Sequence, residues 1–268
     1  MFSLTLLPSH QDHWFITTIS VILVTLVASP ILFKLTYLLP RLLFKTQQLQ
    51  WRLLLRPLRH VYKINTPWYR KSSMFHSALF WQANPSPLKP NRVKQWHRIG
   101  WLSLLIPLLS LVMIADTLNA IIITLLGWWL LVSAEIDQEH QLLLDSLTLP
   151  LLWIGLLVNL ILDWVSLEQA VLGAIMGYVL LWSVYQVHFA LTKREGMGYG
   201  DFKLAAALGA WVGLQNLPLI LILAAMTALL ISLWRRWRFA EPMDQMFPFG
   251  PSLAIAGWLV IALLALKQ

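Results

Sequence analysis

Cysteine is absent from this chain of 268 residues, and acids are scarce, with 12 Asp and Glu against 20 Lys and Arg. The missing thiols exclude disulfides and every thiolate-ligated zinc or iron–sulfur site, and they leave the redox compartment open. The sequence also contains no internal repeat or low-complexity tract. With so few acids, a carboxylate in an apolar setting is a candidate for chemistry.

Apolar residues dominate the composition. Hydrophobic residues make up 58% of the chain and charged residues 12%, a balance that one soluble core could not bury but that a multi-pass membrane protein requires. The first apolar run is too long for a signal-peptide core and predicts a retained span. We expect an all-α polytopic protein with about eight transmembrane helices. They are predicted near residues 14–38, 100–115, 118–134, 147–162, 168–191, 202–215, 217–234 and 249–266.

Positive charge is concentrated in three of the connections. The segment from Arg41 to Arg98 holds 12 of the 20 Lys and Arg and no acid, and the other basic groups are at 193–194 and 235–238. The positive-inside rule places all three in the cytoplasm and both termini outside. Asp137 and Asp201 then lie on the same cytoplasmic side, so their pairing is geometrically possible.

Aromatic residues are interleaved with the charges of the basic insertion between the first two predicted spans. In a soluble domain this mixture would raise the possibility of nucleic-acid binding. In a membrane protein it favours a polybasic segment held on anionic headgroups by aromatic anchors, so we expect membrane lipids as partners and no nucleic acid. The five prolines between Arg41 and Arg98 argue against one long helix, although residues 47–63 could form a short amphipathic one. The predicted domains are a first span at 1–39, the basic loop at 40–99 and a seven-helix domain at 100–268.

The sequence GMGYGD at 196–201 places Asp201 behind three alternating glycines and ahead of a long apolar segment. Glycines permit close backbone approach, whereas a carboxylate at the bilayer boundary is costly and indicates a functional site. A tight loop before a packed helix would explain the glycines but not the acid. The following segment also carries small residues four apart, as does the fifth predicted span, a pattern typical of helices packed nearly backbone to backbone. These small residues are Ala205, Gly209, Gly213, Gly173 and Gly177.

A second carboxylate, Asp137, occupies a similar boundary 64 residues earlier (201 − 137). Peptide hydrolysis by two carboxylates needs an ionised member to activate water and a protonated member to donate to the carbonyl oxygen. Two acids held together near lipid resist double ionisation and so supply that state. Several acids share the predicted loop of Asp137, so spacing alone leaves the choice of partner open. We expect neither metal catalysis through His140, which lacks converging ligands, nor serine chemistry, because no nucleophile elbow is present.

Three segments resemble the signatures of type IV prepilin peptidases, and they occur in the family's order. They are IDQEHQLLLDSLTLPLLW at 136–153, EGMGYGDFKL at 195–204 and FPFGP at 247–251. The resemblance covers about half of the chain, residues 128–260, and the separation of the two aspartates fits it. A lone Gly-x-Gly-Asp is less specific, since presenilin-type proteases share it. Leu144 departs from the proline that the family usually carries before the residue matched by Asp145, which should alter a turn.

This resemblance implies that Asp137 and Asp201 are the catalytic aspartates. It further implies removal of short basic leaders, after a glycine, from type IV prepilins or type II secretion pseudopilins at the cytoplasmic face of a bacterial inner membrane. The peptidase activity would need no cofactor. The implied active-site loop consists of Gly196, Gly198, Gly200 and Lys203. The acids that could attract a basic leader are Glu135, Glu139, Asp145 and Glu195.

The N-terminal third departs from the family pattern. Members that also methylate the new N-terminus carry a Gly-Ser-Phe-Leu-Asn run, an Arg-Leu-Pro and zinc-binding Cys-x-x-Cys pairs, of which residues 27–31 and 38–40 keep only a trace. Zinc bound through cysteines is excluded, and S-adenosylmethionine is expected only if methyltransferase activity is retained. The alternatives are a bifunctional leader peptidase and N-methyltransferase, a proton-coupled transporter, and a noncatalytic membrane scaffold. Proximity of Asp137 and Asp201 would favour a peptidase; the particular pilin and the oligomeric state are left open.

Overall fold

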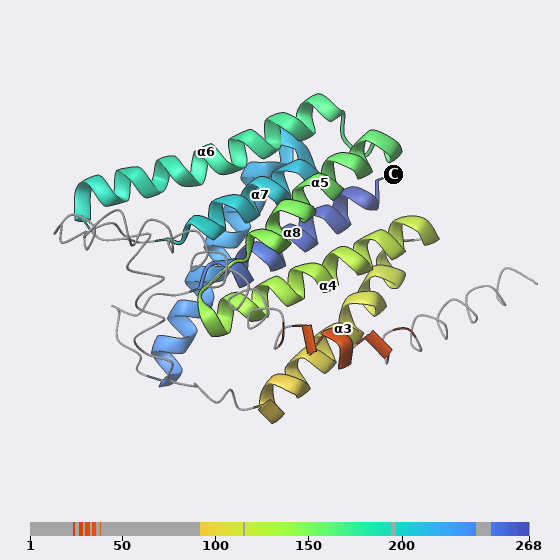
Figure 1. The fold of residues 1–268 in the computed structure, drawn as a ribbon, viewed down its shortest axis with the longest axis horizontal. Helices are drawn as coiled ribbons and strands as arrows, with labels where there is room; N and C mark the ends of the chain where they lie inside the picture. Colours follow the sequence, from red (N-terminus) through yellow and green to blue (C-terminus); the bar gives the residue numbers. More distant parts are fainter. Residues whose placement is uncertain are drawn as a thin grey trace, which may run out of the picture.

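The computed structural model describes residues 92–114, 116–193, 197–239 and 248–267, with isolated positions between 24 and 38. Every regular element in these ranges is an α-helix, in agreement with the predicted all-α class. The predicted first span and basic loop lie almost entirely outside the described residues. The helices, shown in Figure 1, are α3 (Arg92–Met113), α4 (Thr117–His140), α5 (Asp145–Leu162), α6 (Leu167–Thr192), α7 (Tyr199–Phe239) and α8 (Gly250–Ala265).

Four of these helices, α4 to α7, are long and apolar enough to cross a membrane, and part of α3 and all of α8 are shorter apolar helices. Large apolar side chains also cover the outer faces of the bundle, as at Trp153 and Ile161. A helical bundle that is apolar outside as well as inside suits lipid, because helices satisfy their own backbone groups. The described chain is therefore a multi-pass membrane protein. The prediction of eight spans is not confirmed by these four.

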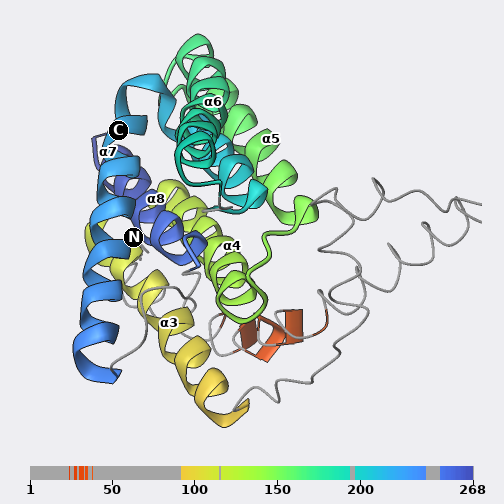
Figure 2. The same cartoon turned by 90° about the vertical axis from the view of Figure 1, so that its left-hand side faces the viewer.

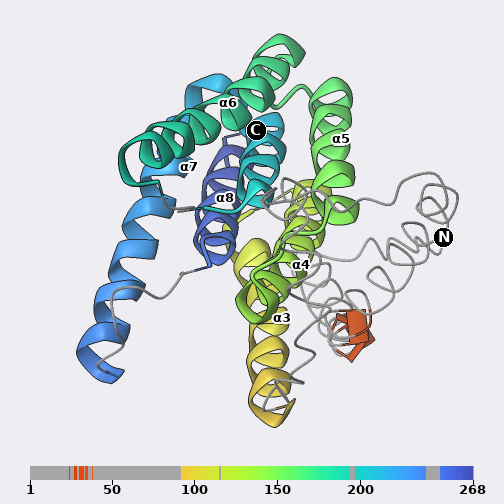
Figure 3. The same cartoon turned by 60° about the vertical axis from the view of Figure 1, so that its left-hand side comes forward.

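Helix α7 contains a sharp break at Gly213, where φ is 75° and ψ is 172°. Positive φ favours glycine, since it has no Cβ to clash. The predicted break near residue 216 was therefore wrong by a few residues, and the two predicted spans 202–215 and 217–234 belong to two arms of one element. The first arm packs among the other helices, and the second runs along one side of the bundle (Figures 2 and 3).

Asn159 of α5 supports the break in α7. Its buried side-chain amide donates to the carbonyl of Ala210 at 2.8 Å and to the carbonyl of Trp211 at 3.2 Å. Its side-chain oxygen accepts from the N–H of Val165 at 3.2 Å. Buried carbonyls next to a helix break need such partners, because no water reaches them in an apolar interior.

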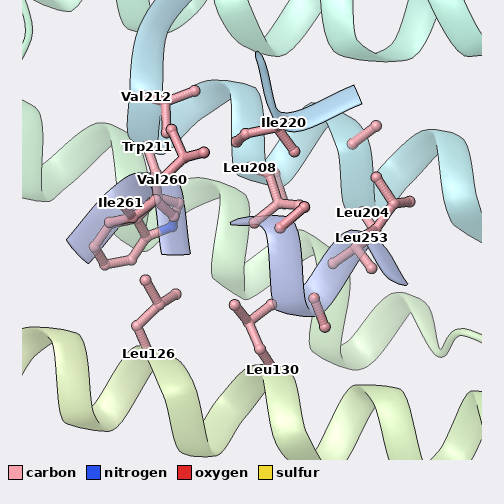
Figure 4. Packing of buried hydrophobic residues seen from close by; sticks show 14 of the residues in the cluster. Leu126, Leu130, Leu204, Leu208, Trp211, Val212, Ile220, Leu253, Val260 and Ile261 are labelled. Atoms are coloured by element: carbon pink, nitrogen blue, oxygen red, sulfur yellow. The ribbon is translucent and has the colours of Figure 1, made fainter. Parts of the chain in front are cut away.

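The core forms where α8 lies between α4 and α7. Figure 4 shows Leu253 and Ile261 of α8 placed between Leu130 of α4 and Leu208 of α7. All four side chains are almost completely buried. In a bilayer the surrounding lipid is as apolar as these side chains, so close packing and dispersion, more than exclusion of water, stabilise this contact.

Helices α6 and α7 touch through their backbones. An added Cβ at Gly173 would strike the Gly209 carbonyl oxygen, and one at Gly177 would lie 2.5 Å from the Ala205 carbonyl oxygen. The spacing of small residues predicted this close approach, and the structure confirms it. The first arm of α7, which carries Asp201, is thereby fixed against α6.

Four tryptophan side chains tie neighbouring helices together. Each indole N–H donates to a backbone carbonyl of an adjacent helix, at 3.0 to 3.1 Å. Such bonds are well suited to a bundle in lipid, where a buried polar group needs a protein partner. The pairs are Trp128 with Ser103, Trp129 with Leu147, Trp211 with Leu151, and Trp258 with Ile123.

Candidate active site

The ends of four helices meet at one end of the bundle (Figure 1). Asp137 lies in the last turn of α4, and Asp145 is the first residue of α5. Asp201 lies in the first turn of α7, and Gly250 is the first residue of α8. Residues that are distant in the sequence are therefore brought to one place by the alternating direction of the helices.

Asp137 is held by both its side chain and its main chain. Its Oδ2 accepts a hydrogen bond from the N–H of Gly250 at 3.0 Å, and only 5% of the residue is exposed. Its carbonyl accepts from the N–H of Gln141 at 2.7 Å. Gln141 adopts a left-handed conformation that ends α4. These bonds fix the carboxylate relative to α8.

Asp201 lies close enough to Asp137 for their charges to interact. It is 6% exposed, and its N–H donates to the carbonyl of Gly198 at 3.1 Å. Its Oδ1 is buried and has no hydrogen-bond partner within the described ranges. A buried carboxylate oxygen without a partner is costly, so it marks a position where a reacting group could bind. The structure thus brings together the two aspartates that the sequence singled out.

The glycines before Asp201 have different roles. An added Cβ at Gly200 would lie 2.6 Å from the Cβ of Leu143, so the start of α7 approaches the α4–α5 connection closely. At Gly198 the nearest atom would be Asp201 Oδ2, at an ordinary distance of 3.7 Å. Gly198 contributes the carbonyl that accepts the Asp201 N–H, and its backbone also forms a hydrogen bond with the Asp201 carboxylate. Gly196 lies outside the described residues.

Lys203 pairs with Asp145 across the start of two helices. The Lys203 Nζ lies 2.6 Å from Asp145 Oδ1. The Lys203 side chain is 33% exposed and the Asp145 side chain 58% exposed. The pair joins the first turn of α7 to the first turn of α5. The charge of Asp145 is therefore directed at Lys203, on the rim of the site.

Glu135 occupies a different environment from the one predicted. The sequence pattern predicted a helix ending at residue 134 and a polar loop that held Glu135, Asp137 and Glu139. That boundary was wrong, because α4 continues to His140. Glu135 is 3% exposed, and its Oε2 accepts from Arg98 Nη2 at 2.6 Å. The ion pair satisfies the acid inside the bundle, so a polar residue there does not end the helix.

The burial of Glu135 also affects the predicted leader-binding acids. Residues two apart on a helix point away from each other, so Glu135 faces α3 while Asp137 faces α8. A buried, paired carboxylate on that face is not accessible to a leader, and we leave Glu135 out of the leader-binding surface. Glu139 is half-buried. Glu195 lies outside the described residues.

Among the described residues no group of three or more His, Asp or Glu side chains could hold a metal ion. Two contacts near the aspartates went unnoticed in the sequence, the Gly250 amide and the Arg98 guanidinium. Gly250 belongs to the FPFGP segment and precedes Pro251, which is typical of a helix start. The apolar run at 249–266 predicted the helix, but not its contact with Asp137.

The described part of the chain is thus a helical membrane protein with a paired-carboxylate site at one end. Residues 124–233, which contain both aspartates, match the type IV leader peptidase family. The resemblance that the sequence motifs indicated is therefore confirmed over this region.

Curated relatives match about half of the chain. The prepilin leader peptidase/N-methyltransferase of Dichelobacter nodosus is 53% identical over 132 residues, which cover 49% of this chain and 45% of that protein. The protein of the same name from Pseudomonas aeruginosa is 51% identical over 138 residues, 51% of this chain and 47% of the relative. The one from Pseudomonas putida is 46% identical over 145 residues, 54% and 50%. The chain matches about half the length of these relatives, and no solved structure matches it.

Proposed function

We propose that this protein is a membrane aspartic endopeptidase that removes the basic leader from type IV prepilins or type II secretion pseudopilins. Asp137 and Asp201 are its catalytic pair. The observation that carries this proposal is the convergence of these two buried carboxylates from helices α4 and α7. The match of residues 124–233 to the type IV leader peptidase family supports the substrate class.

The chemistry requires opposite protonation states in the two carboxyl groups. One ionised carboxylate takes a proton from water, whose oxygen attacks the scissile carbonyl carbon. The protonated carboxyl donates to the carbonyl oxygen, and collapse of the tetrahedral intermediate breaks the C–N bond as the leaving amine gains a proton. Two acids in one desolvated site favour this singly protonated state.

The proposed setting is a bacterial inner membrane, with eight spans and the site at the cytoplasmic face. The basic insertion at 40–99 would lie on anionic lipid headgroups. The peptidase activity would use no cofactor. Nothing in this setting calls for nucleic acid as a partner.

Replacement of each aspartate tests the proposal. Asp137→Asn and Asp201→Asn should each abolish cleavage of a synthetic prepilin. In each variant the one remaining carboxyl group cannot both activate water and polarise the carbonyl. Asp163→Asn is the matched control, since Asp163 follows α5 at the other end of that helix. Near-normal cleavage by Asp137→Asn together with loss in Asp145→Asn would show that the first aspartate is misassigned.

A second candidate function is N-methylation of the new pilin N-terminus. It is favoured by the relatives, whose names include N-methyltransferase. The missing Asn-containing motif and zinc cysteines argue against it. Methyltransferase activity is therefore the alternative to the peptidase function, and S-adenosylmethionine would be needed only for that alternative. A proton-coupled transporter or a scaffold explains the paired, buried aspartates less well, because neither needs two carboxylates at one end of the bundle.

A further inference from the structure

The first N–H of α8 is directed at the paired aspartates. Gly250 donates to Asp137 Oδ2 at 3.0 Å, in a buried hydrogen bond. The first N–H groups of a helix have no partner within the helix, so this donor is available. The next residue, Pro251, has no N–H to compete with it. The 16 residues of α8 also place the positive end of their dipole at this point.

The contact depends on the absence of a side chain at position 250. An added Cβ would lie 2.6 Å from Asp137 Oδ2 and 3.0 Å from its Cγ. A carboxylate could not keep its present position against such a group. Glycine is therefore required here by the close approach of Asp137.

The two aspartates differ in what surrounds them. Each carboxylate has one backbone hydrogen bond, Asp137 with Gly250 and Asp201 with Gly198. The difference is that Asp201 Oδ1 is buried without a partner within the described ranges. A backbone N–H at a helix start stabilises a charged carboxylate, whereas a buried oxygen that lacks a donor destabilises it. The unpartnered Oδ1 therefore disfavours the charged form of Asp201 relative to that of Asp137. Arg98 and Lys203 do not reverse this difference, because each pairs with another acid.

We propose that Gly250 is a positioning residue whose N–H holds Asp137 in the ionised form and in place, which makes Asp137 the base and Asp201 the acid. The assignment of the two roles rests on the proposed peptidase function. The contact itself does not, and it can be tested without activity. Asp137 would take the proton from water, and Asp201 would donate its proton to the carbonyl oxygen.

The kinetic test compares two glycines of α8. Gly250→Ala should lower kcat by roughly 100-fold or more and leave KM within about twofold, because displacement of a catalytic group by about 1 Å affects the transition state most. Gly257→Ala is the matched control, since its Cβ would lie 2.5 Å from the flexible end of Leu208. It should keep kcat within roughly threefold, although it too crowds the core. An equal loss of kcat in both variants would overturn the proposal.

An infrared measurement of the protonation state of Asp137 tests the role of Gly250 without any assay of activity. In an Asp201→Asn background, the infrared C=O band of a protonated carboxylic acid should be absent for Asp137 at neutral pH. It should appear when Gly250→Ala is added and stay absent when Gly257→Ala is added. The same spectrum in all three proteins would overturn the role of Gly250. Failure of the wild type to cleave any prepilin would instead contradict the proposed function.

A third comparison keeps the test decisive if Gly250→Ala does not fold. Asp137→Asn retains an oxygen that can accept the Gly250 N–H, whereas Asp137→Ala leaves that N–H without a partner. The Asn variant should melt at a clearly higher temperature than the Ala variant in detergent. Equal melting temperatures would show that the bond contributes nothing, and would overturn the proposal.

Discussion

Arg98 Nη2 lies 2.6 Å from Glu135 Oε2, and this ion pair joins α3 to α4 two residues before Asp137. The acid is buried, whereas 42% of the arginine side chain is exposed. Arg98 is also the last residue of the basic stretch that runs from Arg41. The pair therefore connects the end of that stretch to the helix that carries the first aspartate.

Breaking the Arg98–Glu135 pair should destabilise the protein. Arg98→Ala leaves a buried carboxylate without its donor, at an expected cost of about 2 kcal/mol. Thermal or denaturant unfolding in detergent would measure it. The double variant Arg98→Leu with Glu135→Leu should recover much of the loss, because it leaves no buried charge. If the double variant were as unstable as the two single changes combined, the ion pair would not be the cause.

The α6–α7 contact predicts a sharp difference between two glycines. Gly209→Ala should cost about 1–3 kcal/mol or prevent folding, since its Cβ would strike the Gly173 carbonyl oxygen and a backbone atom cannot move aside easily. Gly100→Ala is the control, because nothing lies within 4 Å of its added Cβ. That change, inside α3, should be neutral or stabilise by about 0.5 kcal/mol. Equal unfolding of both variants would contradict the backbone contact.

Asn159 offers a test of the break in α7. Asn159→Ala removes the donor to the carbonyls of Ala210 and Trp211, and should cost about 2 kcal/mol or more. Gln215→Ala, at an exposed position two residues after the break, should change stability by less than about 0.5 kcal/mol. Denaturant titration of both variants in the same detergent provides the comparison. A small effect at Asn159 would mean that the carbonyls have other partners.

The Lys203–Asp145 pair should contribute little to stability because it is exposed. A double-mutant cycle with Lys203→Ala and Asp145→Ala should give a coupling energy of about 0.2–1 kcal/mol, which falls as salt is added. The charge-exchanged double variant Lys203→Asp with Asp145→Lys should recover the coupling. A coupling that salt leaves unchanged would indicate a pair more buried than the structure shows.

Chelators should leave leader cleavage unchanged, since no cysteine is present to bind zinc. Methyl transfer from S-adenosylmethionine should be weak or absent. Incubation of the purified protein with a prepilin and labelled methyl donor measures cleavage and methylation together. Stoichiometric methylation of the cleaved pilin would establish the bifunctional alternative.

Much of the arrangement could be predicted from residue type and spacing. Small residues four apart indicated that α6 and α7 each pack closely against a neighbouring helix, and the glycine-led Asp201 indicated the site. Both signals are local, because side-chain size and the cost of a charge at the bilayer boundary can be read from one short stretch of sequence. Charge in the connections made a pairing with Asp137 possible, since the positive-inside rule placed both acids at one membrane face. The choice of Asp137 among the neighbouring acids came from the resemblance to type IV prepilin peptidases.

Other features depend on contacts that apolar runs do not reveal. The extent of α4 was underestimated because Glu135 and Asp137 have partners inside the bundle, Arg98 and Gly250. A polar residue looks like the end of a span until its partner is known. The position of the break in α7 also escaped, since the apolar run continues past Gly213 and only the backbone conformation marks the turn.

The break at Gly213 lets the long helix α7 fit within the thickness of a bilayer. If the 41 residues of α7 formed one straight rod, it would be about 60 Å long, at 1.5 Å per residue. The hydrocarbon layer is only about 30 Å thick, so such a rod would extend far into water on at least one side. Membrane thickness therefore favours the bent shape independently of any contact within the protein. The backbone conformation of Gly213 thus shortens the distance that α7 spans along the membrane normal.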